Sequence, residues 1–254
     1  MASRLTQKIE AATAAGRKAL IPYLPAGYPT KDRFWKELAE LDAGGADIIE
    51  IGVPFSDPVA DGPVVEQAAL ECLEQGVTLA WILAELQAHR ASIKAEIVLM
   101  GYMNPFMQYG LDRLAKDAAA AGVAGFIVPD LPFEEADEFK AAITPYGMDY
   151  VSLVGLNTSA ERLKLYADHA TGFAYFVSVL GTTGVRESLP EEITAKLSEA
   201  KAAFPVPMAL GFGIKTPDQL AAFGDLVDAV VFGSSLIKHI AGGDSSASFM
   251  SRWA

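Results

Sequence analysis

Ala46-Asp-Ile-Ile-Glu-Ile-Gly-Val-Pro-Phe-Ser-Asp-Pro-Val-Ala-Asp-Gly-Pro63 is the most informative stretch of this chain. It begins with isoleucines at positions 48, 49 and 51, an apolar run that is typical of a parallel strand buried on both faces. Glu50 stands inside that run. Because a carboxylate in apolar surroundings is costly to ionise, we expect the pKa of Glu50 to be raised unless a partner compensates.

The residues after this strand form a stiff loop that carries two further acids, Asp57 and Asp61. Its prolines and glycines end the strand and restrict the backbone. A buried acid at a strand end, facing a second carboxylate on a loop, is a pattern suited to proton transfer. The alternative is that Glu50 is structural and pairs with an arginine or a backbone amide.

Composition limits the class of protein. The chain has 254 residues, is half hydrophobic and carries a formal charge of −12. The length predicts one domain over residues 1–254, and the charge disfavours nucleic acid or an anionic membrane as a partner. No apolar stretch reaches the roughly 20 residues of a membrane span. The polar N-terminus lacks a signal-peptide core, and Cys72 is the lone cysteine, so we expect a cytoplasmic protein and a buried, unreactive thiol.

Apolar runs alternate with helix-patterned segments along the whole chain. The expected strands are 20–24, 47–51, 96–100, 125–128, 150–154, 174–179, 207–210 and 229–232. The expected helices are 30–41, 64–73, 79–89, 111–121, 133–143, 159–168, 190–203, 217–223 and 234–240. This alternation predicts an α/β fold, a (β/α)8 TIM barrel, with a doubly wound open sheet as the alternative. The tail from Gly242 is expected to form a short helix or to fray.

In such a barrel the chemistry lies at the C-terminal ends of the strands. Glu50 lies near the end of the second expected strand, and Asp61 is in the loop that follows it. Other polar residues in or after strands are Tyr102, Asn104, Asp130 and Tyr175. We expect these side chains to converge on one mouth.

Three glycine-bearing turns follow the last three expected strands, at 181–184, 211–213 and 233–235. Glycines allow backbone N–H groups to approach a phosphate, and a helix N-terminus such as the one after the last turn favours an anion. Together the turns predict a phosphate site, although any one of them could merely serve its turn. Neither of the two later turns contains Lys or Arg, so the site would rely on backbone dipoles.

The residues that several other kinds of enzyme need are missing from the expected positions in this sequence. Lys215 is the only lysine directly after an expected strand, which disfavours a Schiff-base aldolase. His89, His169 and His239 all lie on or beside expected helices, so no metal site is predicted. Neither a Gly-x-x-x-x-Gly-Lys loop nor a Gly-x-Gly-x-x-Gly after a strand is present. What remains is acid–base chemistry on a small phosphorylated substrate, without a cofactor.

Residues 50–63 closely resemble the signature of the tryptophan synthase alpha subunit family. The resemblance covers nearly the whole chain and extends to Ile21-Pro-Tyr-Leu-Pro-Ala-Gly-Tyr-Pro29, Met100-Gly-Tyr-Met-Asn-Pro105, Val128-Pro-Asp-Leu-Pro132, Thr183-Gly184, Gly211-Phe-Gly213 and Gly233-Ser234. It implies a carbon–carbon lyase of tryptophan biosynthesis that cleaves indole-3-glycerol phosphate to indole and glyceraldehyde 3-phosphate. It also implies no cofactor in this chain and an alpha2beta2 heterotetramer with a beta subunit that carries pyridoxal phosphate.

The resemblance also implies roles for individual residues. Glu50 would protonate indole C3 and then take the glycerol hydroxyl proton, while Asp61 would hold the ring N–H. Tyr175 would position Glu50, and Thr183 would position Asp61. Tyr102 would also help to position the substrate. The indole ring would be walled by Tyr23, Met100, Ile127 and Phe212, and for these four residues core packing is the alternative. The phosphate would be bound by Gly184, Gly213, Gly233 and Ser234. Pro54 and Asp57 would face the beta subunit.

Two features depart from the family pattern. Thr182 stands where the family commonly has Val, in a loop expected to act as a lid, and the C-terminus ends early for the family. Two alternative functions stay open: a free-standing lyase that needs no partner, and a catalytically idle barrel that only regulates a beta subunit. The presence of both carboxylates speaks against the idle barrel. An isomerase or epimerase on another phosphate barrel is more distant, because the metal-binding histidines typical of such epimerases are not found at strand ends.

Overall fold

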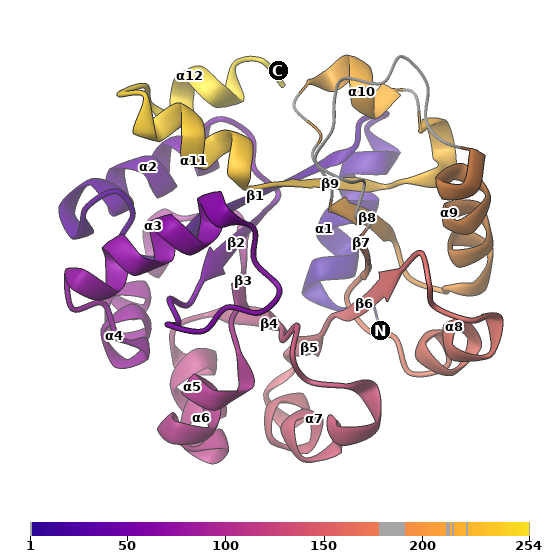
Figure 1. Cartoon of the computed structure of the whole chain (residues 1–254), viewed down its shortest axis with the longest axis horizontal. Coiled ribbons are helices and arrows are strands. Elements are labelled where there is room, and N and C mark those ends of the chain that lie inside the picture. Colours follow the sequence, from indigo (N-terminus) through magenta and orange to yellow (C-terminus); the bar gives the residue numbers. More distant parts are fainter. Residues whose placement is uncertain (1, 178–190, 212–213, 215, 222, 254) are drawn as a thin grey trace.

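The strands form a nearly closed parallel barrel with helices around it (Figure 1). The computed structural model describes residues 2–177, 191–211, 214, 216–221 and 223–253. The strands are β1 (Ala19–Pro25), β2 (Ile48–Gly52), β3 (Glu96–Met100), β4 (Val123–Ile127), β5 (Asp149–Tyr150), β6 (Ser152–Gly155), β7 (Ala174–Val177), β8 (Met208–Gly211) and β9 (Ala229–Phe232). Their order is β5-β4-β3-β2-β1-β9-β8-β7-β6, so the predicted barrel is confirmed.

The predicted fifth strand, 150–154, is divided into two pieces. β5 pairs with β4, whereas β6 pairs with β7 on the other side. Between them the N–H of Val151 donates to the carbonyl of Phe126 over 2.9 Å. The barrel therefore closes through one continuous segment that changes its hydrogen-bonding neighbour halfway along.

The helices of the outer layer follow the prediction with three differences. The predicted ones are α2 (Lys31–Ala43), α3 (Pro63–Glu74), α4 (Leu79–His89), α6 (Leu111–Ala120), α8 (Ala160–Ala167), α9 (Glu191–Ala203), α10 (Pro217–Ala221) and α11 (Ser234–Ala241). The predicted helix 133–143 is a 3-10 turn at Phe133–Glu135 followed by α7 (Asp137–Ile143). Two helices were not predicted, α1 (Arg4–Ala14) and α5 (Met103–Tyr109). In the described part of the chain, no helix has the length and apolar character needed to cross a membrane.

α1 closes the N-terminal end of the barrel. Its buried residues Leu5, Ile9 and Ala12 belong to one apolar cluster with inward-facing strand residues such as Ile21 and Val98. A Cβ on Gly125 would lie 2.9 Å from Leu5 Cδ1, so the helix packs directly against the strand backbone. The interior is thereby filled at this end, and space for a ligand is left at the opposite end.

Strand alternation places Glu50 inside the barrel. Successive side chains of a strand point to opposite faces. Ile48 belongs to the interior cluster, whereas Ile49 and Ile51 belong to the larger cluster between the strands and the helices. Glu50 is two residues beyond Ile48 and shares its face, closer to the C-terminal end of β2.

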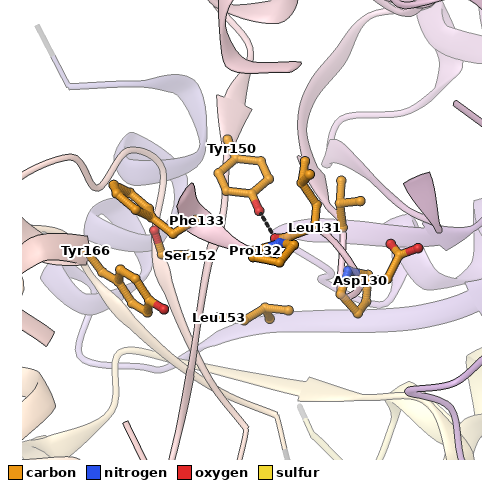
Figure 2. Close-up of a pocket in the computed structure, with 10 residues that line it drawn as sticks. Asp130, Leu131, Pro132, Phe133, Tyr150, Ser152, Leu153 and Tyr166 are labelled. Atoms are coloured by element: carbon orange, nitrogen blue, oxygen red, sulfur yellow. Dashed lines mark hydrogen bonds between the residues drawn. The ribbon is translucent and has the colours of Figure 1, made fainter. Parts of the chain in front are cut away.

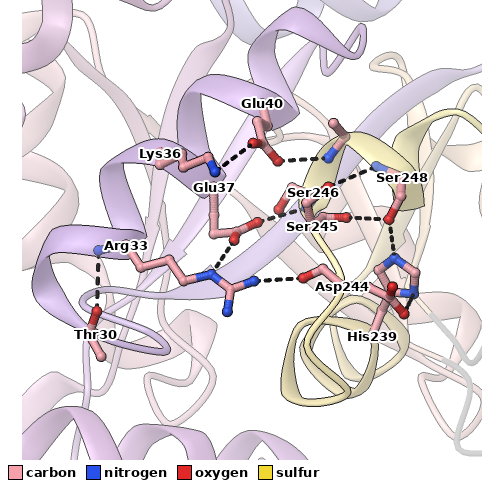
Figure 3. A network of polar contacts seen from close by, with 11 residues as sticks. Thr30, Arg33, Lys36, Glu37, Glu40, His239, Asp244, Ser245, Ser246 and Ser248 are labelled. Atoms are coloured by element: carbon pink, nitrogen blue, oxygen red, sulfur yellow. Dashed lines mark hydrogen bonds and ion pairs between the residues drawn. The ribbon is translucent and has the colours of Figure 1, made fainter.

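The tail forms a helix, α12 (Ser246–Met250), that is held against α2 (Figure 3). The Glu37 carboxylate, only 1% exposed, accepts hydrogen bonds from Arg33 Nε and from the N–H of Ser246, both at 2.7 Å. The N–H of Ala247 donates to Glu40 over 3.0 Å. Of the two outcomes expected for this tail, the structure shows the short helix.

We expect Glu37→Ala to lower the free energy of unfolding by about 2 kcal/mol, because the change leaves the buried N–H of Ser246 without an acceptor and removes the ion pair of the partly exposed Arg33. Glu40→Ala is the matched control. The Glu40 side chain is 22% exposed, and we expect its loss to cost less than about 1 kcal/mol. Urea unfolding measures both, and equal losses would contradict this account of the tail.

Candidate active site

A cavity of about 640 Å³ opens at the C-terminal end of the barrel. Strand residues and the loops that follow the strands both line it. Of the predicted site residues, those on the cavity wall are Tyr23, Glu50, Asp61, Met100, Ile127, Tyr175, Gly233 and Ser234. Residues distant in sequence therefore meet in one space, as the barrel topology predicts.

Glu50 is the most deeply buried acid of this cavity. Its side chain is 2% exposed, and its Oε2 atom has no hydrogen-bond partner. Within the described residues it forms no ion pair, so nothing there supports a structural pairing with an arginine. Burial, and secondly the charge of Asp61, raise the pKa of Glu50 to about 8. Glu50 therefore holds its proton at neutral pH.

Asp61 lies on the loop between β2 and α3, and Tyr102 holds that loop. The N–H of Ala60 donates to the Tyr102 hydroxyl over 3.1 Å, and the N–H of Asp61 donates to the carbonyl of Pro58 over 3.1 Å. Burial raises the pKa of Asp61 to about 6, although a hydrogen bond from Tyr102 opposes the shift. Tyr102 was predicted to position the substrate, but it is not on the cavity wall and instead contacts the acid-bearing loop.

Two tyrosine rings pack over glycines of neighbouring strands. A Cβ on Gly211 would lie 1.7 Å from Cε2 of Tyr175, and a Cβ on Gly52 would lie 2.2 Å from the hydroxyl of Tyr23. The rings fit only because these strand positions lack side chains. Burial raises the pKa of both tyrosines well above the usual value, and the negative charges of Glu50 and Asp61 add to the shift. Both hydroxyls therefore keep their protons beside the two acids.

The described part of the predicted phosphate site is the start of α11. Gly233 and Ser234 line the cavity where the helix begins. Ser235, which belongs to the predicted turn 233–235, lines it too, and so does Lys238, which was not predicted. The signal of Lys238 was present in the sequence, because this residue is one helical turn beyond Ser234. The predicted residues Thr183, Gly184, Phe212 and Gly213 lie outside the described residues.

Of the two residues expected to contact a beta subunit, one is buried and the other is exposed. Pro54 is buried, whereas Asp57 is exposed and accepts a hydrogen bond from the Ser56 hydroxyl. Phe55 packs against Tyr102 with ring centroids 5.4 Å apart. The base of the loop is therefore fixed to the barrel, and its tip faces outward.

A second, smaller pocket of about 230 Å³ lies beside the loop after β4 (Figure 2). Tyr150 donates from its hydroxyl to the carbonyl of Leu131 over 2.8 Å, and the Asp130 carboxylate accepts the N–H of Met103. Among the described residues that line it, Asp130 is the only acid. The larger cavity, with two acids, is therefore the candidate active site.

Among the residues that the structure describes, no three His, Cys, Asp or Glu side chains gather in a group that could hold a metal ion. His89 stacks on Trp35 with ring centroids 4.3 Å apart, and His239 hydrogen-bonds to Ser248. Cys72 is buried, as predicted.

We expect Glu50→Gln to stabilise the fold increasingly as pH rises. The native state binds the Glu50 proton more tightly than the unfolded chain does, so the wild type loses stability as pH rises from about 5 to about 8. The neutral amide has no such dependence. Urea unfolding of both proteins should show a gap that widens by at most about 1.4 kcal/mol per pH unit. A gap that is constant with pH would contradict the raised pKa.

This chain is similar to known proteins along nearly its whole length. The family model described as tryptophan synthase alpha chain matches residues 9–252. The tryptophan synthase alpha chain of Solidesulfovibrio magneticus is 63% identical over 251 residues, covering 99% of this chain and 98% of that one. Among solved structures, Mycobacterium tuberculosis tryptophan synthase superimposes with a TM-score of 0.90 at 34% identity, covering 99% of this chain and 96% of that one. The alpha subunit from Legionella pneumophila superimposes with a TM-score of 0.88 at 33% identity, covering 98% of this chain and 95% of that one.

Proposed function

This chain belongs to the tryptophan synthase alpha chain family, whose enzymes cleave indole-3-glycerol phosphate to indole and glyceraldehyde 3-phosphate, and we propose that Glu50 and Asp61 carry out this cleavage in the barrel cavity. The observation that carries the proposal is the pair of acids on one cavity wall, with Glu50 buried in a strand and its Oε2 unpartnered, and Asp61 on a loop held by Tyr102. Burial raises the pKa of Glu50 to about 8 and that of Asp61 to about 6. One cavity thus holds a proton donor and an anion at the same neutral pH.

Glu50 supplies the proton that starts the reaction. The bond to the glycerol chain breaks only after indole C3 is protonated, which leaves positive charge on the ring nitrogen. Glu50 is protonated at neutral pH and can donate to C3. The resulting carboxylate then accepts the proton of the glycerol hydroxyl as the carbon–carbon bond breaks, which forms the aldehyde and regenerates the acid. No electron acceptor or cofactor is needed for these steps.

Asp61 stabilises the charge that the first step creates. With a pKa of about 6 it is largely ionised at pH 7 to 8, and it can accept the indole N–H as positive charge develops there. Its loop is held by Tyr102, which fixes the carboxylate relative to the cavity. The apolar wall formed by Met100, Ile127 and Leu153 suits an indole ring.

The phosphate end of the substrate would lie at the start of α11, where Gly233 and Ser234 line the cavity. Pyridoxal phosphate would belong to a beta subunit that consumes the indole, in an alpha2beta2 heterotetramer. The loop after β2, with Asp57 exposed near its tip, is the proposed contact with that subunit. The paired acids favour this catalytic role over an idle regulatory barrel. Copurification of a beta subunit with the untagged chain separates the complex from a free-standing lyase.

We expect Glu50→Gln to slow indole release from indole-3-glycerol phosphate by at least about 100-fold, because it removes general acid–base catalysis. Asp61→Asn should also slow the reaction by about 100-fold, because a charge-stabilising acceptor is lost. Glu74→Gln on α3 is the control, since Glu74 is exposed and not on the cavity wall. Unchanged rates in both cavity variants would reject the assigned roles.

We expect indole release to be fastest between pH of about 6 and about 8, with the alkaline limb caused by Glu50 losing its proton. The negative charge of Asp61 helps to raise the pKa of Glu50. In Asp61→Asn the alkaline limb should therefore move to lower pH. The pH dependence of kcat/KM, which reports the free enzyme, measures this shift for both proteins, and a limb that stays in place or moves upward would show that Glu50 is not the titrating group.

A further inference from the structure

Lys238 brings a positive charge to the cavity wall. It is the only Lys or Arg among the described residues that line the cavity, which also holds the two acids Glu50 and Asp61. The chain as a whole carries a formal charge of −12. An anionic substrate therefore meets a negative protein and two carboxyl groups, and Lys238 is the group on the described wall that can attract it.

The helix geometry directs Lys238 toward the predicted phosphate site. Lys238 is four residues beyond Ser234, so the two lie on one face of α11. Helical side chains tilt toward the N-terminus of their helix and cover the preceding turn. The long lysine chain is therefore placed to reach back over the turn that begins at Gly233, where both residues line the cavity.

No acid in the described part of the chain is paired with Lys238. Lys164, Lys196 and Lys201 each form an ion pair with a nearby carboxylate, whereas Lys238 forms none among the described residues. Its neighbours three and four positions away on the chain are Ser234, Ser235, Ala241 and Gly242, all uncharged. Its ammonium group is therefore available to a ligand.

We propose that Lys238 binds the phosphate of the substrate and makes the cavity selective for a phosphorylated ligand. This inference rests on the proposed function, and it changes the expectation that backbone dipoles alone hold the anion. The N–H groups at the start of α11 position the phosphate, and the ammonium group offsets the repulsion from Glu50 and Asp61.

The test compares Lys238→Met and Lys238→Arg with the wild type. The matched control is Lys36→Met, which removes an equal charge from α2, where Lys36 is exposed. Steady-state indole release gives KM and kcat, and titration calorimetry gives the Kd of glycerol 3-phosphate and of indole. We expect Lys238→Met to raise KM and the Kd of glycerol 3-phosphate by about 10-fold, in the range of one charged hydrogen bond, while kcat and the Kd of indole stay within about 2-fold.

The arginine variant should retain most of the affinity for glycerol 3-phosphate, and its binding should weaken with added salt as in the wild type, whereas Lys238→Met should be less sensitive to salt. Lys238→Met behaving like Lys36→Met would overturn the proposal. So would a loss of kcat or of indole affinity without a change in glycerol 3-phosphate binding, because that would indicate a structural role. Failure of the proposed function would look different, since the wild type itself would then release no indole.

Discussion

The site depends on burying the carboxyl group of Glu50 in the barrel wall while leaving its Oε2 atom without a hydrogen-bond partner. Such a group destabilises the fold when it ionises, so it stays protonated until the pH reaches about 8. The barrel tolerates this group because β2 is paired on both sides, with β1 and with β3. The unfavourable environment is also what makes Glu50 a proton donor at neutral pH, so stability and chemistry are opposed at this residue.

The pKa of the second acid, Asp61, is lower than that of Glu50 because the two residues lie in different parts of the fold. Asp61 is on a loop rather than a strand, and Tyr102 ties that loop to the barrel by accepting the N–H of Ala60. A hydrogen bond from Tyr102 opposes the effect of burial on the pKa of Asp61, which therefore stays near 6. Two carboxyl groups in one cavity thus take opposite protonation states, because one is sunk in an apolar wall and the other has a polar neighbour.

The sequence predicted the barrel and the two acids because both leave local signals. The isoleucine run around Glu50 indicates a strand, and alternation then places the acid on the inner face with Ile48. The split of the fifth strand leaves no such signal, because it depends on which neighbour each half meets. The contact of Tyr102 with the loop of Asp61 leaves no local signal either, because a hydroxyl that reaches a neighbouring loop is visible only in three dimensions. Lys238 gives a weaker signal than the glycine turns, because it lies inside the helix that follows the last of them.

The most direct measurement is the pKa of Glu50 itself. A ¹³C NMR titration of the side-chain carboxyl carbons, with the Glu50 signal assigned by its absence in Glu50→Gln, gives that value without any substrate. The account predicts a midpoint near 8, so that the group is still protonated at pH 7. A midpoint near the ordinary glutamate value of about 4.3 would contradict it, because Glu50 would then carry no proton to donate.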